Sequence, residues 1–518
     1  MANTVITIIG GGASSVAFIY SLLEGLSRSG CHSSLSLFLI DRQSQCGCGL
    51  AYSEDCITNL LNTRAEFISP FADQPGHFYK WLSDNRDVWE DAFPGIELLP
   101  QAFLPRPLFG LYLAHMVRCL VNRAVALGCQ LIQVHDEAVS LSFAHDGKVV
   151  VLTRGNLSFP SDHVVLSCGN ARSLEYQHLA TSEGFFNSPY PLRRTCRLIP
   201  KHASVAIVGS RLSAIDTLIG LTTNGHVGPI TLHSRTGALP YVRGTQARYK
   251  PKILTPETVK SCISSYGVVR LEDVARWTLQ ELALGGEATG AIDWSSKCAQ
   301  KPAIEFLTDE IAQAQHPRFW QSVLYSTNAV LDLIWPAMPD EDRRRFLGYS
   351  SWWMAYRVSI PVENAIKIKV LLETEQLSIC KGELKTVECG AGFTLVVGDC
   401  SDVRRCEYDA VVIATGTPRD VRMFDNPLVQ NMLNQGLACI DPFGGVRVSA
   451  KTGGLINQLG CVDDRITVLG ELTSGAFFFT SALDINSRHS ASRANDILSR
   501  LSLVHDRGSY SLAPRLFA

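Results

Sequence analysis

Several features typical of membrane, secreted and nucleic-acid-binding proteins are missing from this sequence of 518 residues. No uncharged apolar run approaches the roughly 18 residues that a membrane-spanning helix needs. The net charge is -2, which gives no electrostatic case for nucleic acid or an anionic membrane as a partner. No basic segment followed by a cleavable apolar one stands at the start, so we expect no leader peptide. These absences predict a globular cytoplasmic protein.

Zinc-binding and disulfide patterns are also missing, although the chain contains 16 cysteines. None of them forms a C-x-x-C pair, and the close pair Cys46 and Cys48 has no matching cluster or nearby histidines. We interpret the cysteines as reduced thiols and expect no metal site. A redox disulfide between Cys46 and Cys48 stays open as an alternative.

The most informative stretch lies near the start, where residues 5–9 form a short, β-branched apolar run without charge. Such a run is typical of a parallel strand that is buried on both faces. It leads directly into a G-x-G-x-x-S turn that contains Gly10, Gly12, Ala13 and Ser14. The first glycine permits a tight turn, and the second lets a phosphate approach the backbone at a helix N-terminus. The pattern therefore predicts a pyrophosphate-binding turn.

A helix and a second strand complete this unit. Residues 16–23 have the apolar spacing of a helix that packs against a sheet. The second strand ends in Asp41, whose carboxylate can accept hydrogen bonds from both hydroxyls of an adenosine ribose. Arg42, Gly49 and Leu50 follow in a polar, glycine-bearing loop that we expect to cross the ribose and diphosphate. Strand, turn, helix, strand and terminal acid in this order predict a dinucleotide site.

Two later stretches repeat each other, and a second strand, turn and helix lie between them. Residues 162–169 and 409–416 each consist of an acid, a buried strand and a terminal glycine, which is Gly416 in the second copy. Residues 205–216 form the second strand-turn-helix pattern. The chain therefore contains two nested nucleotide-binding units, and its length favours two or three domains over a single core.

The second turn departs from the usual glycine pattern. It begins with Gly209 and includes Ser213, but Arg211 occupies the place of the second glycine. The Cβ of an arginine crowds the approach of a pyrophosphate, whereas its guanidinium could clamp phosphate bidentately. Arg235, just beyond the following strand, is placed to pair with an adenosine 2′-phosphate, which favours NADPH over NADH. The sequence leaves open whether Arg211 clamps or blocks, and whether Arg235 is an ordinary surface charge.

The segment of about residues 251–353 does not look like a sheet. Amphipathic helical patterns occupy residues 256–264, 271–284, 303–315 and 319–333. We interpret the segment as a helical insertion within the second nucleotide-binding unit. A substrate lid, a plain packing element and an oligomer interface all stay open as its role.

The order of these units resembles that of flavoproteins with two dinucleotide-binding domains. In detail, it resembles the FAD/NAD(P)-binding family related to flavin-dependent N-hydroxylating monooxygenases. The residues that carry the resemblance are 8–14, 49–53, 61–62, 106–110, Trp353 with Arg357, 414–416 and 470–482. The resemblance spans nearly the whole chain, although only the first glycine turn and the strand before Gly416 are specific by themselves.

The resemblance implies an α/β fold with two Rossmann-like dinucleotide-binding domains, the second inserted into the first. Residues 1–200 and 425–518 would form the FAD-binding domain. Residues 201–424 would form an NAD(P)-binding-like domain that carries the helical insertion.

The resemblance also implies which residues approach the flavin. Asn62 would face the ring, where its amide can both donate and accept hydrogen bonds. After Gly470, a helix beginning near Thr473, Ser474 and Gly475 would bring its N-terminus beside the flavin pyrimidine and favour the anionic reduced flavin. Asn62 and Ser474 are the catalytic candidates. The alternative is a Thr/Ser helix cap followed by a stripe of core aromatics.

Two classes of function remain open. In the first, NADPH reduces FAD, oxygen adds at flavin C4a, and a small substrate is hydroxylated at an amine nitrogen by this hydroperoxyflavin. In the second, the NADPH site is vestigial, and the protein is an FAD-dependent oxidase or dehydrogenase. A flavin-binding scaffold without activity is a third alternative. The expected partners are a small-molecule substrate and molecular oxygen, while a homo-oligomer stays open.

Overall fold

The computed structural model describes residues 3–29, 34–169, 171–286, 301–399 and 402–509. A six-stranded sheet contains the N-terminal strands and two strands from near the C-terminus. Its strands are, in spatial order, β16 (Gly454–Ile456), β17 (Val462–Val468), β7 (His163–Leu166), β1 (Thr4–Ile9), β2 (Leu35–Asp41) and β3 (Gln130–His135). β16 is antiparallel to β17, and all other neighbours are parallel.

A second, five-stranded sheet is parallel throughout. Its strands are, in spatial order, β11 (Leu377–Lys381), β10 (Ile230–Ser234), β9 (Val205–Val208), β15 (Ala410–Ile413) and β8 (Phe185–Phe186). The buried apolar side chains of β9 and β15 form the centre of this sheet. The α/β fold class predicted from the sequence is confirmed.

The repeated acids have the same structural role in both sheets. The carboxylate of Asp162, just before β7, accepts a hydrogen bond from the backbone N–H of Val5 in β1 at 2.8 Å. The carboxylate of Asp409, just before β15, accepts one from the N–H of Ser204, beside β9, at 2.7 Å. Each acid therefore satisfies an amide where the neighbouring parallel strand begins.

Two small antiparallel sheets extend the two parallel ones. The first consists of β4 (Ala138–Phe143), β5 (Val149–Thr153) and β6 (Ser158–Ser161), and the second of β12 (Leu384–Cys389), β13 (Phe393–Asp399) and β14 (Asp402–Tyr408). Each precedes the strand that enters the centre of a parallel sheet, so the two halves of the chain share one plan.

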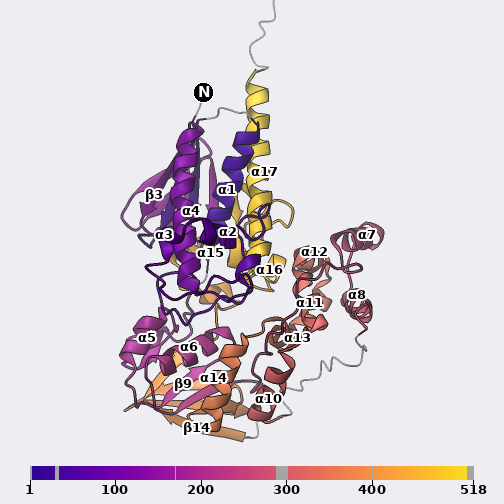
Figure 1. Cartoon of the computed structure of the whole chain (residues 1–518). Helices are drawn as coiled ribbons and strands as arrows, with labels where there is room; N and C mark the ends of the chain where they lie inside the picture. Colours follow the sequence, from indigo (N-terminus) through magenta and orange to yellow (C-terminus); the bar gives the residue numbers. More distant parts are fainter. Residues whose placement is uncertain (1–2, 30–33, 170, 287–300, 400–401, 510–518) are drawn as a thin grey trace, which may run out of the picture.

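Helices cover both parallel sheets. Those of the first region are α1 (Ala13–Ser29), α2 (His77–Asp84), α3 (Arg86–Trp89), α4 (Arg106–Ala126), α15 (Pro427–Asn434) and α17 (Leu483–Ser509), and those beside the second sheet are α5 (Leu192–Leu198), α6 (Leu212–Thr223) and α14 (Val362–Glu373). α1 and α17 lie side by side although they are far apart in sequence (Figure 1). A Cβ on Gly25 would lie 2.4 Å from the Leu498 side chain, so Gly25 permits this close contact. No helix in the described ranges is both long and apolar enough to cross a membrane.

The predicted helical insertion is confirmed, apart from residues 287–300, which lie outside the described part. It contains α7 (Pro256–Tyr266), α8 (Leu271–Ala283), α10 (Ala303–Gln313), α11 (Phe319–Ser326), α12 (Leu331–Ala337) and α13 (Asp340–Arg357). Its outer helices α7 and α8 extend away from both sheets (Figure 1). Trp277 and Ile334 belong to a small core of its own. The predicted helix over residues 319–333 is divided, because a 3-10 turn, η3 (Thr327–Ala329), separates α11 from α12.

The expected aromatic helix after Gly470 differs from the observed structure. A 3-10 turn, η5 (Gly470–Thr473), leads into the four-residue α16 (Ser474–Phe477), and the chain then leaves helical geometry. Phe478 has a φ of 61°, a left-handed conformation that ends the helix. Its ring stacks on Trp335 of the insertion, with ring centres 4.7 Å apart. The aromatic stripe is therefore a packing surface for the insertion, which ties that segment to the first sheet region. The remaining 3-10 turns are η1 (Ala65–Phe67), η2 (Gln177–Leu179) and η4 (Val421–Met423).

Candidate functional site

A small cavity of about 120 Å³ opens at the first glycine turn. Of the predicted cofactor residues, Gly10, Gly12, Asp41, Arg42, Gly49 and Leu50 line it. Gly12 and Gly49 face each other across the turn, because a Cβ on Gly49 would lie 3.2 Å from the Gly12 Cα. The turn and the loop after Asp41 therefore form one narrow cradle of bare backbone, as a bound pyrophosphate requires.

Gly10 and Asp41 fix the geometry of this cradle. Gly10 has a φ of 97°, and a Cβ there would lie 2.2 Å from the backbone oxygen of Ser167. The two carboxylate oxygens of Asp41 accept hydrogen bonds from the N–H of Gly11 at 2.5 Å and of Gln43 at 2.7 Å. Each oxygen keeps a further lone pair, so this oriented carboxylate can still accept a hydroxyl proton.

A larger cavity of about 1000 Å³ adjoins the small one. Leu50 and Ala171 line both cavities, so the two spaces meet at these residues. The predicted residues Asn62, Arg211, Ser213 and Gly416 line the larger space together with Leu50. Residues predicted from separate parts of the chain are thus brought to one continuous site.

Other predicted residues lie outside the two linings. These are Ala13, Ser14, Gly209, Arg235, Gly470, Thr473, Ser474 and Gly475. Gly470 is nevertheless next to the first turn, since a Cβ there would lie 3.7 Å from the Ser14 Oγ. Gly209 permits close packing against the residue that follows β15, since a Cβ on Gly209 would lie 2.6 Å from the Ala414 oxygen.

The turn of Thr473, Ser474 and Gly475 is directed into the protein interior. The Thr473 hydroxyl donates to the Gly470 backbone oxygen at 2.7 Å, and Ser474 is buried. A Cβ on Gly475 would lie 2.3 Å from the carboxylate of Asp441, so a neighbouring loop covers this turn. The residues of the same segment that do line the large cavity are Glu471, Phe479, Ser481 and Ala482.

The second turn is held by the helical insertion. Arg211 is the N-cap residue of α6, and its guanidinium donates to the backbone oxygen of Ser351 in α13 at 2.6 Å. Arg235 is exposed beyond β10. The structure therefore keeps Arg211 at the wall of the large cavity and Arg235 away from it.

A buried ion pair connects the two sheet regions beside this wall. A guanidinium nitrogen of Arg106, at the start of α4, lies 2.8 Å from the carboxylate of Asp216 in α6. The Tyr190 hydroxyl donates to the same carboxylate at 2.7 Å. Burial raises the pKa of Asp216, while the nearby Arg106 charge opposes that rise. The pair satisfies two buried charges and holds α4 against the second nucleotide-binding unit.

Glu471 is a titratable group that the sequence did not single out. Its carboxylate accepts a hydrogen bond from the Thr480 hydroxyl at 3.1 Å. Burial raises the pKa of Glu471 above its ordinary value. A carboxyl group with a raised pKa in a cavity wall is a candidate proton donor or acceptor. Its only sequence signal was its position directly after Gly470.

Cys46 and Cys48 lie beneath the first turn, both buried and both free thiols. Burial, together with the charge of Asp41, raises the pKa of Cys46 to about 12. A thiol with so high a pKa forms little thiolate near neutral pH and is a poor nucleophile. The structure thus places both as packing groups, Cys46 beside Gly11 and Cys48 beside Gly110 of α4.

A basic lining is the main feature that the sequence reasoning missed. The cationic residues around the large cavity are Arg64, Arg106, Arg172, Arg211, Arg243, Arg248, Lys250, Arg357 and Arg488, and the acids of this lining are Glu471 and Asp484. Arg211 belongs to the second turn, and Arg106 and Arg357 belong to the residues that carry the resemblance. The other basic residues come from segments that are distant in sequence, so no local motif reveals that they gather here.

Two nucleotide-binding sheets, a glycine cradle and an adjoining cavity define a dinucleotide-binding α/β fold. Residues 7–171 match the family model described as FAD-NAD(P)-binding, which confirms the prediction for this part. By sequence, no curated protein matches this chain.

Solved structures of N-hydroxylating flavin enzymes are similar to the whole chain. The reduced ornithine hydroxylase of Pseudomonas aeruginosa is 13% identical with a TM-score of 0.57, and the match covers 96% of this chain and 100% of that one. The L-lysine 6-monooxygenase of Pseudomonas syringae is 14% identical with a TM-score of 0.55, covering 95% and 99%. The FAD-bound cadaverine monooxygenase of Erwinia amylovora is 12% identical with a TM-score of 0.57, covering 96% and 95%. At these identities the likeness shows the fold, and it confirms the resemblance predicted from the sequence.

Proposed function

We propose that this protein is an FAD- and NADPH-dependent oxidoreductase, and in detail a monooxygenase that hydroxylates a small substrate at an amine nitrogen. The observation that carries the proposal is the continuity of the two cavities. Gly12 and Asp41 line the small cavity, Asn62 lines the large one, and Leu50 lines both. FAD held at the cradle would therefore have a substrate-sized space beside it.

The chemistry of the lining residues indicates a role for each of them. Gly12 and the N-terminus of α1 would hold the pyrophosphate, and Asp41 the adenosine ribose. Bound FAD would supply the redox chemistry, which is hydride transfer from NADPH and electron transfer to oxygen. The Asn62 amide can both donate and accept hydrogen bonds at the cavity wall. Glu471, with its raised pKa, can hold or release a proton there.

The comparisons support hydroxylation at nitrogen because the similar enzymes are described as acting on ornithine, lysine and cadaverine, all of which are amines. The proposed domains are residues 1–200 with 425–518, and 201–424. β17 in the first sheet and β15 in the second support this division. β8, at Phe185–Phe186, lies within residues 1–200 but pairs with β15 in the second sheet, so the second sheet includes a strand from the first segment. The expected cytoplasmic location stays a proposal.

The test is anaerobic mixing of the purified, flavin-loaded protein with NADPH. Rapid bleaching of the flavin absorbance is the expected result, followed by oxygen uptake when air is admitted. Asn62→Ala should lower the yield of hydroxylated product relative to hydrogen peroxide without releasing FAD. Flavin that is not bleached by NADPH would refute the NADPH-dependent reading, and an Asn62→Ala protein with unchanged spectrum and turnover would make Asn62 structural.

An FAD-dependent oxidase or dehydrogenase is the second candidate, and one observation favours it. Arg211 occupies the place of a glycine in the second turn and is held by Ser351 of α13. If this arrangement excludes a pyrophosphate, only the substrate itself would bleach the flavin in the same anaerobic experiment.

A further inference from the structure

Two arginines contact the ring of one tyrosine in the wall of the large cavity. The guanidinium carbons of Arg243 and Arg357 lie 4.0 and 4.5 Å from the centre of the Tyr325 ring. The ring attracts both cations through its π face, although the two positive charges repel each other. All three residues line the cavity. Two cations gathered in this way define a positive site.

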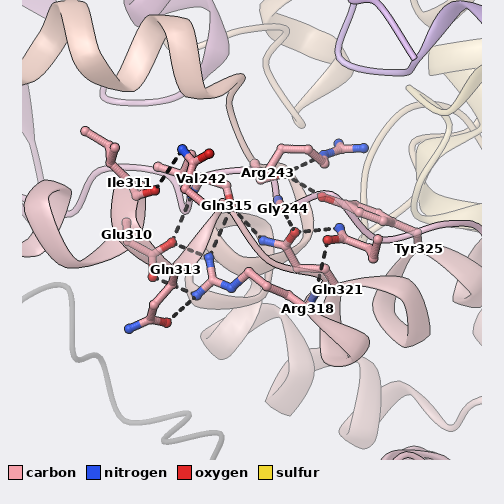
Figure 2. Close-up of polar contacts among 12 residues, drawn as sticks. Val242, Arg243, Gly244, Glu310, Ile311, Gln313, Gln315, Arg318, Gln321 and Tyr325 are labelled. Carbon is pink, nitrogen blue, oxygen red and sulfur yellow. Dashed lines mark hydrogen bonds and ion pairs between the residues drawn. The ribbon is translucent and has the colours of Figure 1, made fainter. Parts of the chain in front are cut away.

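A buried clamp presents Arg243 to the cavity. The Glu310 carboxylate accepts from the Val242 backbone N–H at 3.0 Å, and the Val242 oxygen accepts from Gln321 at 2.8 Å. Glu310 is itself paired with Arg318 at 2.6 Å in a nearly dry environment. Figure 2 shows this network around Val242, with the Arg243 side chain directed toward Tyr325. The clamp fixes the backbone, so Arg243 is oriented before any ligand arrives.

Neutral groups hold the side chain of Arg243. Its Nε donates to the Ser359 Oγ at 2.8 Å, and one terminal nitrogen donates to the Asn62 backbone oxygen at 2.9 Å. The Tyr325 hydroxyl shares a hydrogen bond of 2.5 Å with the same Ser359 Oγ. Arg243 therefore connects the wall bearing Asn62 to α11, and no partner in this set neutralises its charge.

Arg357 is buried with an unused donor. Its residue is 7% exposed, and one terminal nitrogen donates to the Asn328 side-chain oxygen at 2.8 Å. Its buried Nε has no hydrogen-bond partner in the described part of the chain. Burial, together with the charge of Arg243, lowers the pKa of Arg357 to about 10. The group is still charged at neutral pH, and an anion would supply the missing acceptor.

The surrounding arginines add positive charge without close ion pairs, although the charge of Asp484 acts on Arg248 and Arg357 at longer range. Arg64 donates to the backbone oxygens of Gly244 and Gln246, and Arg248 donates to that of Phe67. Within the described ranges, none of Arg64, Arg243, Arg248 and Arg357 forms an ion pair with a carboxylate at 4.0 Å or closer. The same cavity wall contains other arginines that do, since Arg106 pairs with Asp216 and Arg488 with Asp332. The Tyr325 side thus carries four arginines without a close carboxylate partner in the described ranges.

We propose that Arg243 and Arg357 form a receptor for a carboxylate, and that the substrate of the large cavity is a carboxylic acid rather than a simple diamine or an uncharged molecule. A guanidinium matches a carboxylate bidentately. Asp484 is the nearby acid, but it reaches Arg357 only through Asn328, whose amide donates to Asp484 at 3.0 Å, so direct pairing with either arginine is left to the ligand. The proposal rests on the proposed function only in identifying the large cavity as the substrate cavity.

A phosphate of the nicotinamide dinucleotide has the same anionic oxygen chemistry and is the other source of such a group. The substrate is favoured because Arg243 bonds Asn62 directly, whereas the second turn has its own arginine, Arg211, held at Ser351. Arg211, at the second turn, is therefore a separate candidate partner for the nucleotide phosphates.

The experiment measures equilibrium binding to the full-length, flavin-loaded protein by calorimetry, without turnover. The probes are matched pairs that differ in the carboxylate: succinate with succinamide, benzoate with benzamide, and L-lysine with cadaverine. In at least one pair, the carboxylate member should bind at least about tenfold more tightly. Arg357→Gln should weaken that binding by about ten- to a hundredfold, and Arg357→Lys should restore part of it. Arg344→Gln is the matched control, because Arg344 lies on the same helix with a side chain that is 67% exposed.

Equal binding within all three pairs would overturn the proposal, as would an Arg357→Gln protein that binds carboxylates like the wild type. A loss of NADPH affinity with carboxylate binding intact would assign the site to a cofactor phosphate and also overturn it. Arg243→Gln tests the same receptor from a partly exposed position if Arg357→Gln does not fold. Reduction of the flavin by NADPH is measured separately, so failure of this proposal is distinguishable from failure of the proposed function.

Discussion

Substitution of Gly12 separates cofactor binding from folding. A Cβ built on Gly12 meets only the Gly49 Cα, at 3.9 Å, which is an ordinary contact. Gly12→Ala should therefore cost at most about 1 kcal/mol in the free energy of unfolding, because alanine is a poorer helix N-cap than glycine. The same methyl group would occupy the space that a pyrophosphate needs. We expect FAD affinity to fall by about ten- to a hundredfold, which corresponds to about 1.4–2.8 kcal/mol.

Gly10→Ala provides the contrast. A Cβ at Gly10 would lie 2.2 Å from the Ser167 oxygen, and the φ of 97° is unfavourable for alanine. The backbone strain alone costs about 1–3 kcal/mol, and the collision adds to it, so this variant should lose stability together with FAD. Flavin titration of the apoprotein and denaturation of the FAD-free form measure the two effects. A Gly12→Ala protein that binds FAD like the wild type, or that unfolds as readily as Gly10→Ala, would refute the reasoning.

Three further outcomes are expected. If Arg211 clamps phosphate, Arg211→Gly should weaken NADPH binding by about ten- to a hundredfold, as measured by anaerobic flavin reduction. Tighter binding would show that Arg211 blocks the turn. An unchanged rate of flavin reduction would remove Arg211 from the cofactor site. Asp216→Asn leaves the Arg106 charge buried and unpaired and should cost about 3–5 kcal/mol in denaturant unfolding, whereas an unchanged midpoint would contradict a structural role for the pair. Burial lowers the pKa of His233 to about 4, whereas the imidazole of the unfolded chain takes up its proton near the ordinary pKa of 6.5. This contribution to stability is therefore complete above pH 6.5 and is lost as the pH falls toward 4. His233→Gln should flatten that part of the curve of unfolding midpoint against pH, and an identical slope would exclude His233 as its source.

The first nucleotide-binding unit could be predicted because its signals are local. The strand before Gly10, the turn and Asp41 lie within about one βαβ unit, whose geometry follows from residue type and spacing. The repeated acids Asp162 and Asp409 were visible as a pattern, and the structure gives their reason, since each caps the start of a neighbouring strand. Short-range sequence patterns were thus sufficient to predict the central strands of both sheets.

The walls of the large cavity could not be predicted in the same way. Arg64 precedes η1, Arg243 follows β10, and Arg357 ends α13, so their proximity depends on long-range packing. The sequence predicts a helix for the aromatic segment after Gly470, because aromatic side chains at close spacing are typical of a buried helix face. Phe478 instead ends the helix and stacks on Trp335, a partner that the local sequence does not contain.

The helix α13 gives the insertion a definite place in the proposed site. Its Ser351 oxygen holds Arg211 beside the second turn, and Arg357 at its end contributes to the proposed carboxylate receptor. Since one rigid helix contacts both regions, a ligand that shifts Arg357 would also act on the support of Arg211. Coupling between them requires that each ligand favour the same placement of α13. A carboxylate that tightens NADPH binding would then have its effect reduced by Arg357→Gln, while Arg344→Gln on the exposed face of α13 would leave it unchanged.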